Sequence, residues 1–259
     1  MNYTAIHLEL DAANVATITL NRPDNLNALN FALLDEMQHA LGAIAERGAR
    51  ALLLTGAGRG FSSGADLGAS GGFPDDVGAA LEAHFNPLIQ AVFDLPMPVV
   101  AAVNGPCAGA GCSLALCADI VIAGRSAYFL QAFINIGLIP DAGATWLLPR
   151  LAGRARAMEM MMLGERVSAE QALDWGMIAR VVEDEALLDE GRALATRLAA
   201  GPTAAYALIR KLARDSAHVG LADALGAERI AQRDAGRTED FKQGVTAFLQ
   251  KRSPSFDGR

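Results

Sequence analysis

The sequence predicts an α/β fold followed by a helical C-terminal region. Three short apolar runs, each ending in glycine, have the length and composition of strands that are buried on both faces of a parallel sheet. Amphipathic helical periodicity occurs between the strands and becomes continuous after about residue 184. Together these observations indicate strands joined by helical crossovers. The three runs are residues 51–56, 99–105 and 120–124.

The elements of the N-terminal part follow from local patterns. Residues 5–10 and 15–20 are predicted strands joined by a polar turn at 11–14. A helix is predicted at 31–46, because its apolar side chains recur on one face. These side chains are Leu33, Leu34, Met37, Leu41 and Ile44.

From about residue 184 onward the sequence predicts four amphipathic helices. Their apolar faces are expected to pack on the core or on another subunit. Because Gly201-Pro202 interrupts the helical pattern, the chain is divided into a core of residues 1–200 and a helical region of residues 201–259. The four helices are expected at 185–199, 203–216, 221–235 and 238–250.

Composition excludes several classes of protein. The 259 residues are 52% apolar and 20% charged, which excludes a disordered chain. The net charge of −7 leaves no basic stripe for nucleic acid. The three cysteines, at 107, 112 and 117, match no zinc spacing and are expected to be reduced core thiols.

An uncharged window at residues 95–118 is long enough to span a bilayer, but it contains several prolines and glycines. A buried strand, a tight loop and a buried helix fit this composition better than a membrane span. The N-terminus has neither the basic start nor the apolar core of a signal peptide, so a cytoplasmic protein is expected.

Two glycine-rich loops are candidates for ligand binding. Residues 56–67 follow a strand but match neither the P-loop nor the dinucleotide fingerprint, so a mobile surface loop is the alternative. Residues 104–114 run from a buried strand into a small-residue helix. A helix start near Ala110 would present unpaired N–H groups to a ligand, although a turn that serves only close packing is equally compatible.

A third loop, residues 134–146, contains Asp141. The commoner role of such a residue is a helix N-cap. The alternative is a carboxylate in an apolar setting, where desolvation would raise its pKa into a range useful for acid–base catalysis.

At these three loops the chain resembles the enoyl-CoA hydratase/isomerase family, also called the crotonase family. The resemblance implies a spiral of repeated strand-strand-helix turns, with C-terminal helices that form a homotrimer or a dimer of trimers. It also implies an acyl-CoA thioester substrate, coenzyme A being part of that substrate, with no separate cofactor and no metal. The matching stretches are residues 20–23, 27–29, 60–67, 101–105, 108–111, 118–120, 139–140 and 168–172.

The same resemblance assigns roles within the loops. The backbone amides of Ala65 and Ala110 would form an oxyanion hole for the thioester carbonyl. Lys242 and Lys251 are candidates for holding the adenosine phosphates, or are ordinary solvated lysines. The residues that would lie along the coenzyme A are Ser63, Asp66 and Leu67.

The chain departs from the hydratases of this family at two positions. Where they use two glutamates to activate and protonate water, this chain has Ser113 and Phe133. Neither side chain is a carboxylate base, so ordinary hydration is disfavoured. Asp141 remains as the acid–base candidate, and in a subgroup of the family an acidic residue at this position transfers the proton.

Further stretches resemble the subgroup that isomerises the ring epoxide of phenylacetyl-CoA. The aryl-CoA dehalogenase branch is a second neighbour, but it has histidine where this chain has Asn86 and tryptophan where it has Phe133. Asn86 is expected either to contact the substrate or to cap a turn before Pro87. The stretches shared with the ring-epoxide isomerases are residues 85–88, 137–141, 145–157 and 251–256.

The expected activity is therefore isomerisation of an enoyl-CoA or of a ring-epoxide phenylacetyl-CoA, with Asp141 as the acid–base group. A hydratase-like or hydrolytic enzyme that uses Asp141 with water is one alternative, and a non-catalytic acyl-CoA-binding protein is another. The identity of the acyl group depends on how residues 73–85 fold, a segment whose composition suggests a mobile loop.

Overall fold

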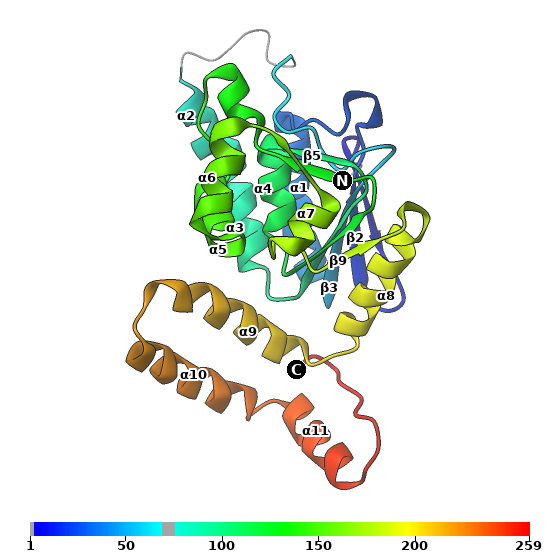
Figure 1. Cartoon of the computed structure of the whole chain (residues 1–259). Coiled ribbons are helices and arrows are strands. Elements are labelled where there is room, and N and C mark those ends of the chain that lie inside the picture. Colours follow the sequence, from blue (N-terminus) through cyan, green and yellow to red (C-terminus); the bar gives the residue numbers. More distant parts are fainter. Residues whose placement is uncertain (1–2, 69–75) are drawn as a thin grey trace.

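The computed structural model describes residues 3–68 and 76–259 and has the predicted α/β architecture (Figure 1). A six-stranded sheet has the order β1-β2-β3-β4-β6-β9. β1 pairs antiparallel with β2, and the other neighbours are parallel. The strands are β1 (Ile6–Leu10), β2 (Val15–Leu20), β3 (Ala51–Gly56), β4 (Val99–Val103), β6 (Ile120–Gly124) and β9 (Arg180–Val182).

A smaller sheet of three short strands has the order β5-β7-β8. These strands are β5 (Pro106–Ala108), β7 (Tyr128–Leu130) and β8 (Arg166–Ser168). β5 follows β4 directly and leads into helix α4 (Gly109–Leu116), which produces the strand-strand-helix turn expected of the spiral. Sequence patterns did not reveal these strands, because three residues are too few to show a period of two.

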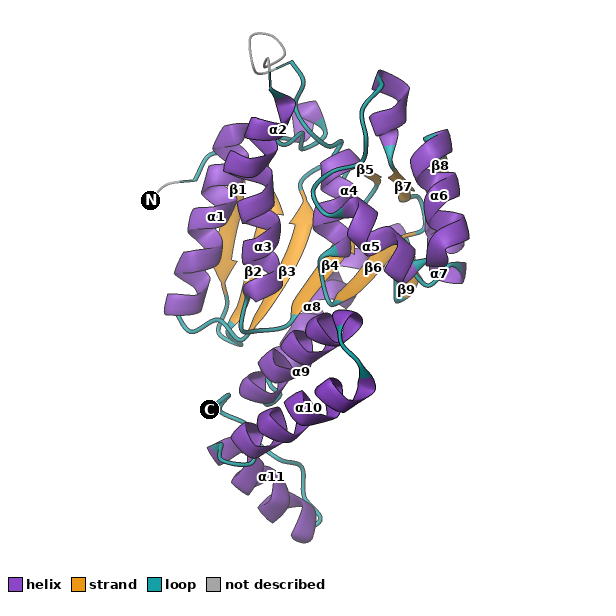
Figure 2. Cartoon of the chain, turned by 90° about the vertical axis from the view of Figure 1, so that its left-hand side faces the viewer, coloured by secondary structure: helices purple, strands orange, loops and turns teal. Residues whose placement is uncertain are grey.

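Helices cover both faces of the large sheet, as the uninterrupted apolar strands require. Leu52 and Leu54 of β3 pack in one core cluster with side chains of α1 (Phe31–Glu46), α3 (Asn86–Asp94) and α4. Leu53, on the opposite face of the same strand, packs with α8 (Leu187–Ala199). Figure 2 looks onto the face covered by α1 and α3, with the strands behind them.

The uncharged window at 95–118 becomes β4, β5 and α4, which lie in the protein core. Cys107, Cys112 and Cys117 are buried free thiols, as expected. Within the part of the chain that the structure describes, no helix is long and apolar enough to cross a membrane.

The expectation of a mobile loop at 73–85 is wrong for the residues from 76 onward. Asp76 caps α2 (Val77–Ala80) by accepting a hydrogen bond from Ala79, and a π-helical turn (Leu81–Phe85) continues directly into α3. Phe73 and its neighbours to residue 75 lie outside the described residues. The remaining helices of the core are α5 (Ala144–Leu151), α6 (Gly153–Leu163) and α7 (Ala169–Asp174).

The last three helices lie apart from the sheets, in the lower half of Figure 1. They are α9 (Thr203–Asp215), α10 (Leu221–Ala235) and α11 (Glu239–Leu249), within two residues of the predicted bounds.

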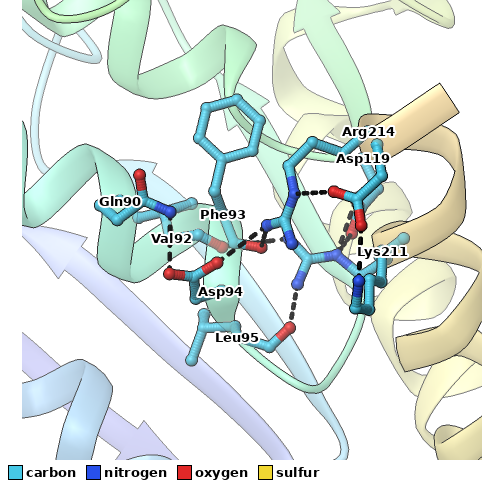
Figure 3. Close-up of polar contacts among 10 residues, drawn as sticks. Gln90, Val92, Phe93, Asp94, Leu95, Asp119, Lys211 and Arg214 are labelled. Atoms are coloured by element: carbon cyan, nitrogen blue, oxygen red, sulfur yellow. Dashed lines mark hydrogen bonds and ion pairs between the residues drawn. The ribbon is translucent and has the colours of Figure 1, made fainter. Parts of the chain in front are cut away.

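Two arginines of α9 join it to the core (Figure 3). The Nε of Arg210 lies 2.7 Å from an Asp119 carboxylate oxygen, and its guanidinium also donates to the carbonyls of Val92 and Leu95. Arg214 binds Asp94 at 2.9 Å. Asp119 also accepts a hydrogen bond from the Val99 N–H, so its role is structural.

Candidate active site

A cavity of about 510 Å³ opens where the loops predicted to carry chemistry converge. Its wall is formed by the start of α1, the end of the 56–68 loop, α2 with its π-helical continuation, the first turn of α4, the 3₁₀ helix Ala132–Ile136, and Asp141. Most of the lining side chains are apolar. A concave, largely apolar cavity with a few converging polar groups is the usual form of a small-molecule site.

Seven of the ten sequence-predicted site residues line this one cavity, although they come from four separate segments of the chain. They are Ser63, Ala65, Asp66, Leu67, Ala110, Phe133 and Asp141.

The other three do not line it. Asn86 lies inside the continuous helix formed by the π-helical turn and α3, so the expectation that it caps a turn is wrong. Lys242 pairs with Glu239 at 2.6 Å on α11, and Lys251 follows that helix in the chain. In Figure 1, α11 lies at the opposite end of the molecule from α2, which contributes to the cavity wall.

The loop that carries Ala65 is anchored to the protein rather than being a mobile surface segment. The buried side chain of Asn27 donates to the carbonyls of Ala57 and Gly60 at 2.9 and 2.7 Å. Further along, the Leu29 N–H donates to the Gly64 carbonyl at 2.7 Å. The interpretation of 56–67 as a mobile loop is therefore wrong.

The Leu29 bond orients the peptide that ends in the Ala65 N–H. In a trans peptide the carbonyl and the following N–H point in opposite directions, so the Ala65 N–H points away from Leu29. Gly64, at φ +94°, permits this turn. Among the backbone bonds of the described residues, none uses the Ala65 N–H as donor, so it is available to a ligand.

The Ala110 N–H belongs to the first turn of α4, whose N–H groups have no partner within the helix. This turn is fastened to the Ala65 loop, because the Ala108 N–H donates to the Ser62 carbonyl at 2.8 Å. The two segments also touch through Gly111, where an added Cβ would lie 2.5 Å from the Ser62 Oγ. The two candidate donors are thus held at a fixed position relative to each other on one wall of the cavity.

Asp141 is not the helix cap that its local sequence favoured. α5 begins three residues later, and no side chain caps it. Instead the carboxyl group lines the cavity, and its Oδ1 is buried without a hydrogen-bond partner in residues 3–68 and 76–259. Burial raises the pKa of Asp141 from 3.8 to about 6. This carboxyl group can therefore exchange a proton near neutral pH.

Asp66 is the other titratable side chain among the described lining residues. Its carboxylate pairs with Arg22 at 2.8 Å, and both side chains are largely buried. Asp66 is therefore engaged in an ion pair with Arg22, whereas the Asp141 Oδ1 has no hydrogen-bond partner among the described residues.

Phe133 and Ser113, the two residues predicted to replace the glutamates of the hydratases, both lie near the start of α4 or within it. The Phe133 ring packs on the first turn of α4, since a Cβ added to Gly109 would lie 3.6 Å from its Cζ. Ser113 donates a hydrogen bond to the Asp141 carbonyl at 3.1 Å. Neither residue supplies a second carboxyl group to the cavity.

Sequence reasoning missed the helical wall of the cavity. The sequence could have revealed it, because Val77, Leu81 and Phe85 recur at helical spacing and continue the amphipathic pattern of α3 backward. It also missed the start of α1, where Phe31 is 41% exposed beside the cavity. The missed residues of these two elements are Asn30, Phe31, Ala32, Val77, Ala80, Leu81 and Phe85.

Known proteins match the chain over nearly its whole length. The family model described as Enoyl-CoA hydratase/isomerase matches residues 11–259. The 1,2-epoxyphenylacetyl-CoA isomerase of Escherichia coli K12 is 48% identical over 264 residues, covering 100% of both chains. A Rhodobacter capsulatus protein named "Probable enoyl-CoA hydratase" is 46% identical over 263 residues, also covering 100% of both chains.

Solved structures agree with these matches. An enoyl-CoA hydratase from Bacillus anthracis superposes with a TM-score of 0.94 at 33% identity, covering 99% of this chain and 100% of that chain. The chain therefore belongs to the enoyl-CoA hydratase/isomerase family, the crotonase family of acyl-CoA enzymes.

Proposed function

We propose that this protein is an acyl-CoA isomerase in which Ala65 and Ala110 bind the thioester oxygen and Asp141 moves the proton. The observation that carries the proposal is the pairing, in one mostly apolar cavity, of two free backbone donors with a buried carboxyl group of raised pKa. Backbone donors of this kind stabilise a developing oxyanion, and a carboxyl group with a pKa near 6 both accepts and returns a proton efficiently.

For a 3-enoyl-CoA the proposed reaction has two proton transfers. The Asp141 carboxylate takes a proton from the carbon next to the thioester, and the electron pair moves onto the thioester oxygen as a dienolate. The amides of Ala65 and Ala110 stabilise that oxygen. The Asp141 carboxylic acid then returns the proton to the far carbon of the dienolate, which gives the 2-enoyl-CoA and restores the carboxylate.

Within this class we propose an enoyl-CoA or a ring-epoxide phenylacetyl-CoA as the substrate. The name of the Escherichia coli relative supports the ring epoxide. The cavity lining also supports an aryl group, because it includes the aromatic rings of Phe31, Phe85 and Phe133. Ser63, Asp66 and Leu67 are proposed to lie along the coenzyme A.

A hydratase-like reaction on an unusual acyl-CoA is the second candidate, and the name of the Rhodobacter capsulatus relative favours it. Among the described lining residues, water addition would rely on Asp141, because the other carboxylate, that of Asp66, is paired with Arg22. A non-catalytic acyl-CoA-binding protein is the remaining alternative.

Labelled water distinguishes these functions. The protein is incubated with 3-enoyl-CoA and with epoxyphenylacetyl-CoA in H₂¹⁸O, and the products are examined by mass spectrometry. We expect products of unchanged mass, since isomerisation adds no oxygen from water. Incorporation of ¹⁸O into the product would identify a hydratase or hydrolase. Tight binding of both esters without turnover would identify a binding protein.

We also propose that residues 201–259 assemble the protein into a homotrimer or a dimer of trimers. Large apolar side chains on α9 to α11 support this, because they are exposed in the single chain. These side chains include Ile209, Leu221, Leu225, Phe241, Phe248 and Leu249. Light scattering is expected to give three or six times the 27.1 kDa mass of the chain, and a monomer mass would contradict the proposal.

Lys242 and Lys251 remain predicted contacts of the adenosine phosphates.

A further inference from the structure

Among the described residues, Asp141 is held by hydrogen bonds to its backbone, and its Oδ1 has no hydrogen-bond partner. Its carbonyl oxygen accepts hydrogen bonds from the Ala144 N–H at 2.9 Å and from the Ser113 Oγ at 3.1 Å. Ala142 and Gly143, which follow it, have φ values of +49° and +85°, so the chain turns sharply there. Ala144 belongs to the same turn, so of these two hydrogen bonds it is the one from Ser113 that ties the turn to another element.

That other element is α4, which also carries the candidate donor Ala110. All eight residues of α4 are buried, and the Ser113 residue is 0% exposed. Ser113 lies three positions after Ala110, a spacing that places two residues on the same face of a helix. One buried helix thus carries the proposed thioester-binding amide at its start and, one turn later, the hydroxyl that binds the backbone of Asp141.

We infer that Ser113 is a positioning residue, whose hydroxyl sets the placement of the Asp141 carboxyl group relative to the Ala110 amide. This inference rests on the isomerase function proposed above. Proton transfer requires the carboxyl group to lie at a fixed distance from the substrate carbon next to the thioester. The position of that carbon is set by the two amides, which bind the thioester oxygen. A displacement of about 1 Å at such a centre can reduce the rate about 100-fold.

The surroundings of Asp141 provide a second readout of its position. Burial is the cause of its raised pKa, and the other described carboxylate that lines the cavity, Asp66, pairs with Arg22. If the anchor is removed, the carboxyl group gains access to water. Its pKa should then fall toward the ordinary value of 3.8.

The test compares Ser113→Ala with Thr55→Val. Both substitutions delete a buried hydroxyl that donates to a backbone carbonyl, since the Thr55 Oγ1 donates to Ala102 at 2.9 Å and Thr55 does not line the cavity. Ser113→Ala is expected to lower kcat about 10- to 100-fold, with KM changed less than about 2-fold. A ¹³C NMR titration should show a lower pKa for Asp141. Thr55→Val is expected to lower the melting temperature while leaving kcat and this pKa unchanged.

A further variant keeps the inference testable if Ser113→Ala does not fold. Ser113→Cys keeps a weak donor at nearly the same size, so its kcat and Asp141 pKa should fall between those of the wild type and Ser113→Ala. If Ser113→Ala does not fold, a lowered kcat and Asp141 pKa in Ser113→Cys support the inference.

The inference and the proposed function can fail separately. Wild-type kcat and an unchanged Asp141 titration in a folded Ser113→Ala variant would overturn the positioning role and leave the role of Asp141 intact. Full activity in an Asp141→Asn variant would overturn the proposed function. The NMR titration of Asp141 in Ser113→Ala would still report whether the anchor holds the carboxyl group in its buried position.

Discussion

Asp141→Asn is expected to lower isomerase turnover by about 10²- to 10⁴-fold, the usual contribution of a positioned general acid–base group. Asparagine keeps the shape of the side chain, but its amide cannot take up and return the proton. The variant should fold normally, because a neutral amide replaces a carboxyl group whose ionised form is disfavoured by burial. The measurements are kcat on 3-enoyl-CoA and on epoxyphenylacetyl-CoA, and the affinity for a saturated acyl-CoA. This affinity should not change.

The pH dependence of the wild type provides an independent check on the same residue. The first proton transfer needs the ionised carboxylate, and burial raises its pKa to about 6. The rate should therefore be low below this pH, rise through about pH 6 and level off above it.

Asp174→Asn, which changes an exposed residue of α7, is a control and should retain the wild-type rate and profile. A wild-type profile that is flat between pH 5 and 8 would contradict the role of Asp141. So would an Asp141→Asn variant that keeps wild-type turnover.

Gly111→Ala is the second substitution with a large expected effect, of about 10²- to 10³-fold on kcat, comparable to the loss of one oxyanion-hole donor. An alanine Cβ at this position would lie 2.5 Å from both the Cβ and the Oγ of Ser62 and 3.1 Å from its carbonyl oxygen. The first turn of α4 and the loop that carries Ala65 must then move apart. The two amides would no longer converge on one oxygen atom.

Gly42→Ala is the matched control, because an added Cβ there meets no atom within 4 Å. It lies inside α1, where alanine in place of glycine should raise stability by about 0.5–1 kcal/mol without affecting turnover. Thermal unfolding and kcat are measured for both variants. A folded Gly111→Ala protein with wild-type kcat would show that the close contact with Ser62 is not needed to align the donors.

The elements that sequence patterns predicted well are those whose pattern is long and regular. β3, β4 and β6 are continuous apolar runs, because helices cover both faces of the sheet they form. The C-terminal helices α9 to α11 were equally clear from their amphipathic period. By contrast, β5, β7 and β8 have three residues each and left no detectable period. Residues 77–85, rich in small residues, suggested a loop but fold as helix.

In the candidate site, too, the sequence predicted the features that depend on local patterns and missed those that depend on tertiary contacts. The loops that carry Ala65 and Ala110 could be identified in the sequence, because their glycines and their order along the chain are distinctive. The interpretation of 56–67 as a mobile loop failed, since it took no account of the anchors that Asn27 and Leu29 provide from another segment.

Local sequence also favoured a capping role for Asp141 over a buried carboxyl group. Capping depends on the three or four residues that follow, whereas burial depends on the elements that pack around the residue.

By itself, the sequence determined the fold class, the family and the loops in which the chemistry is expected, because these follow from periodicity and from short motifs in order. Only the tertiary structure decided that the Asp141 Oδ1 is buried without a hydrogen-bond partner among the described residues, while Asp66 is paired with Arg22. It also decided that Ser113 connects Asp141 to α4. The physical reason is that desolvation, ion pairing and hydrogen bonding between distant segments depend on three-dimensional proximity, which no local pattern of residues encodes.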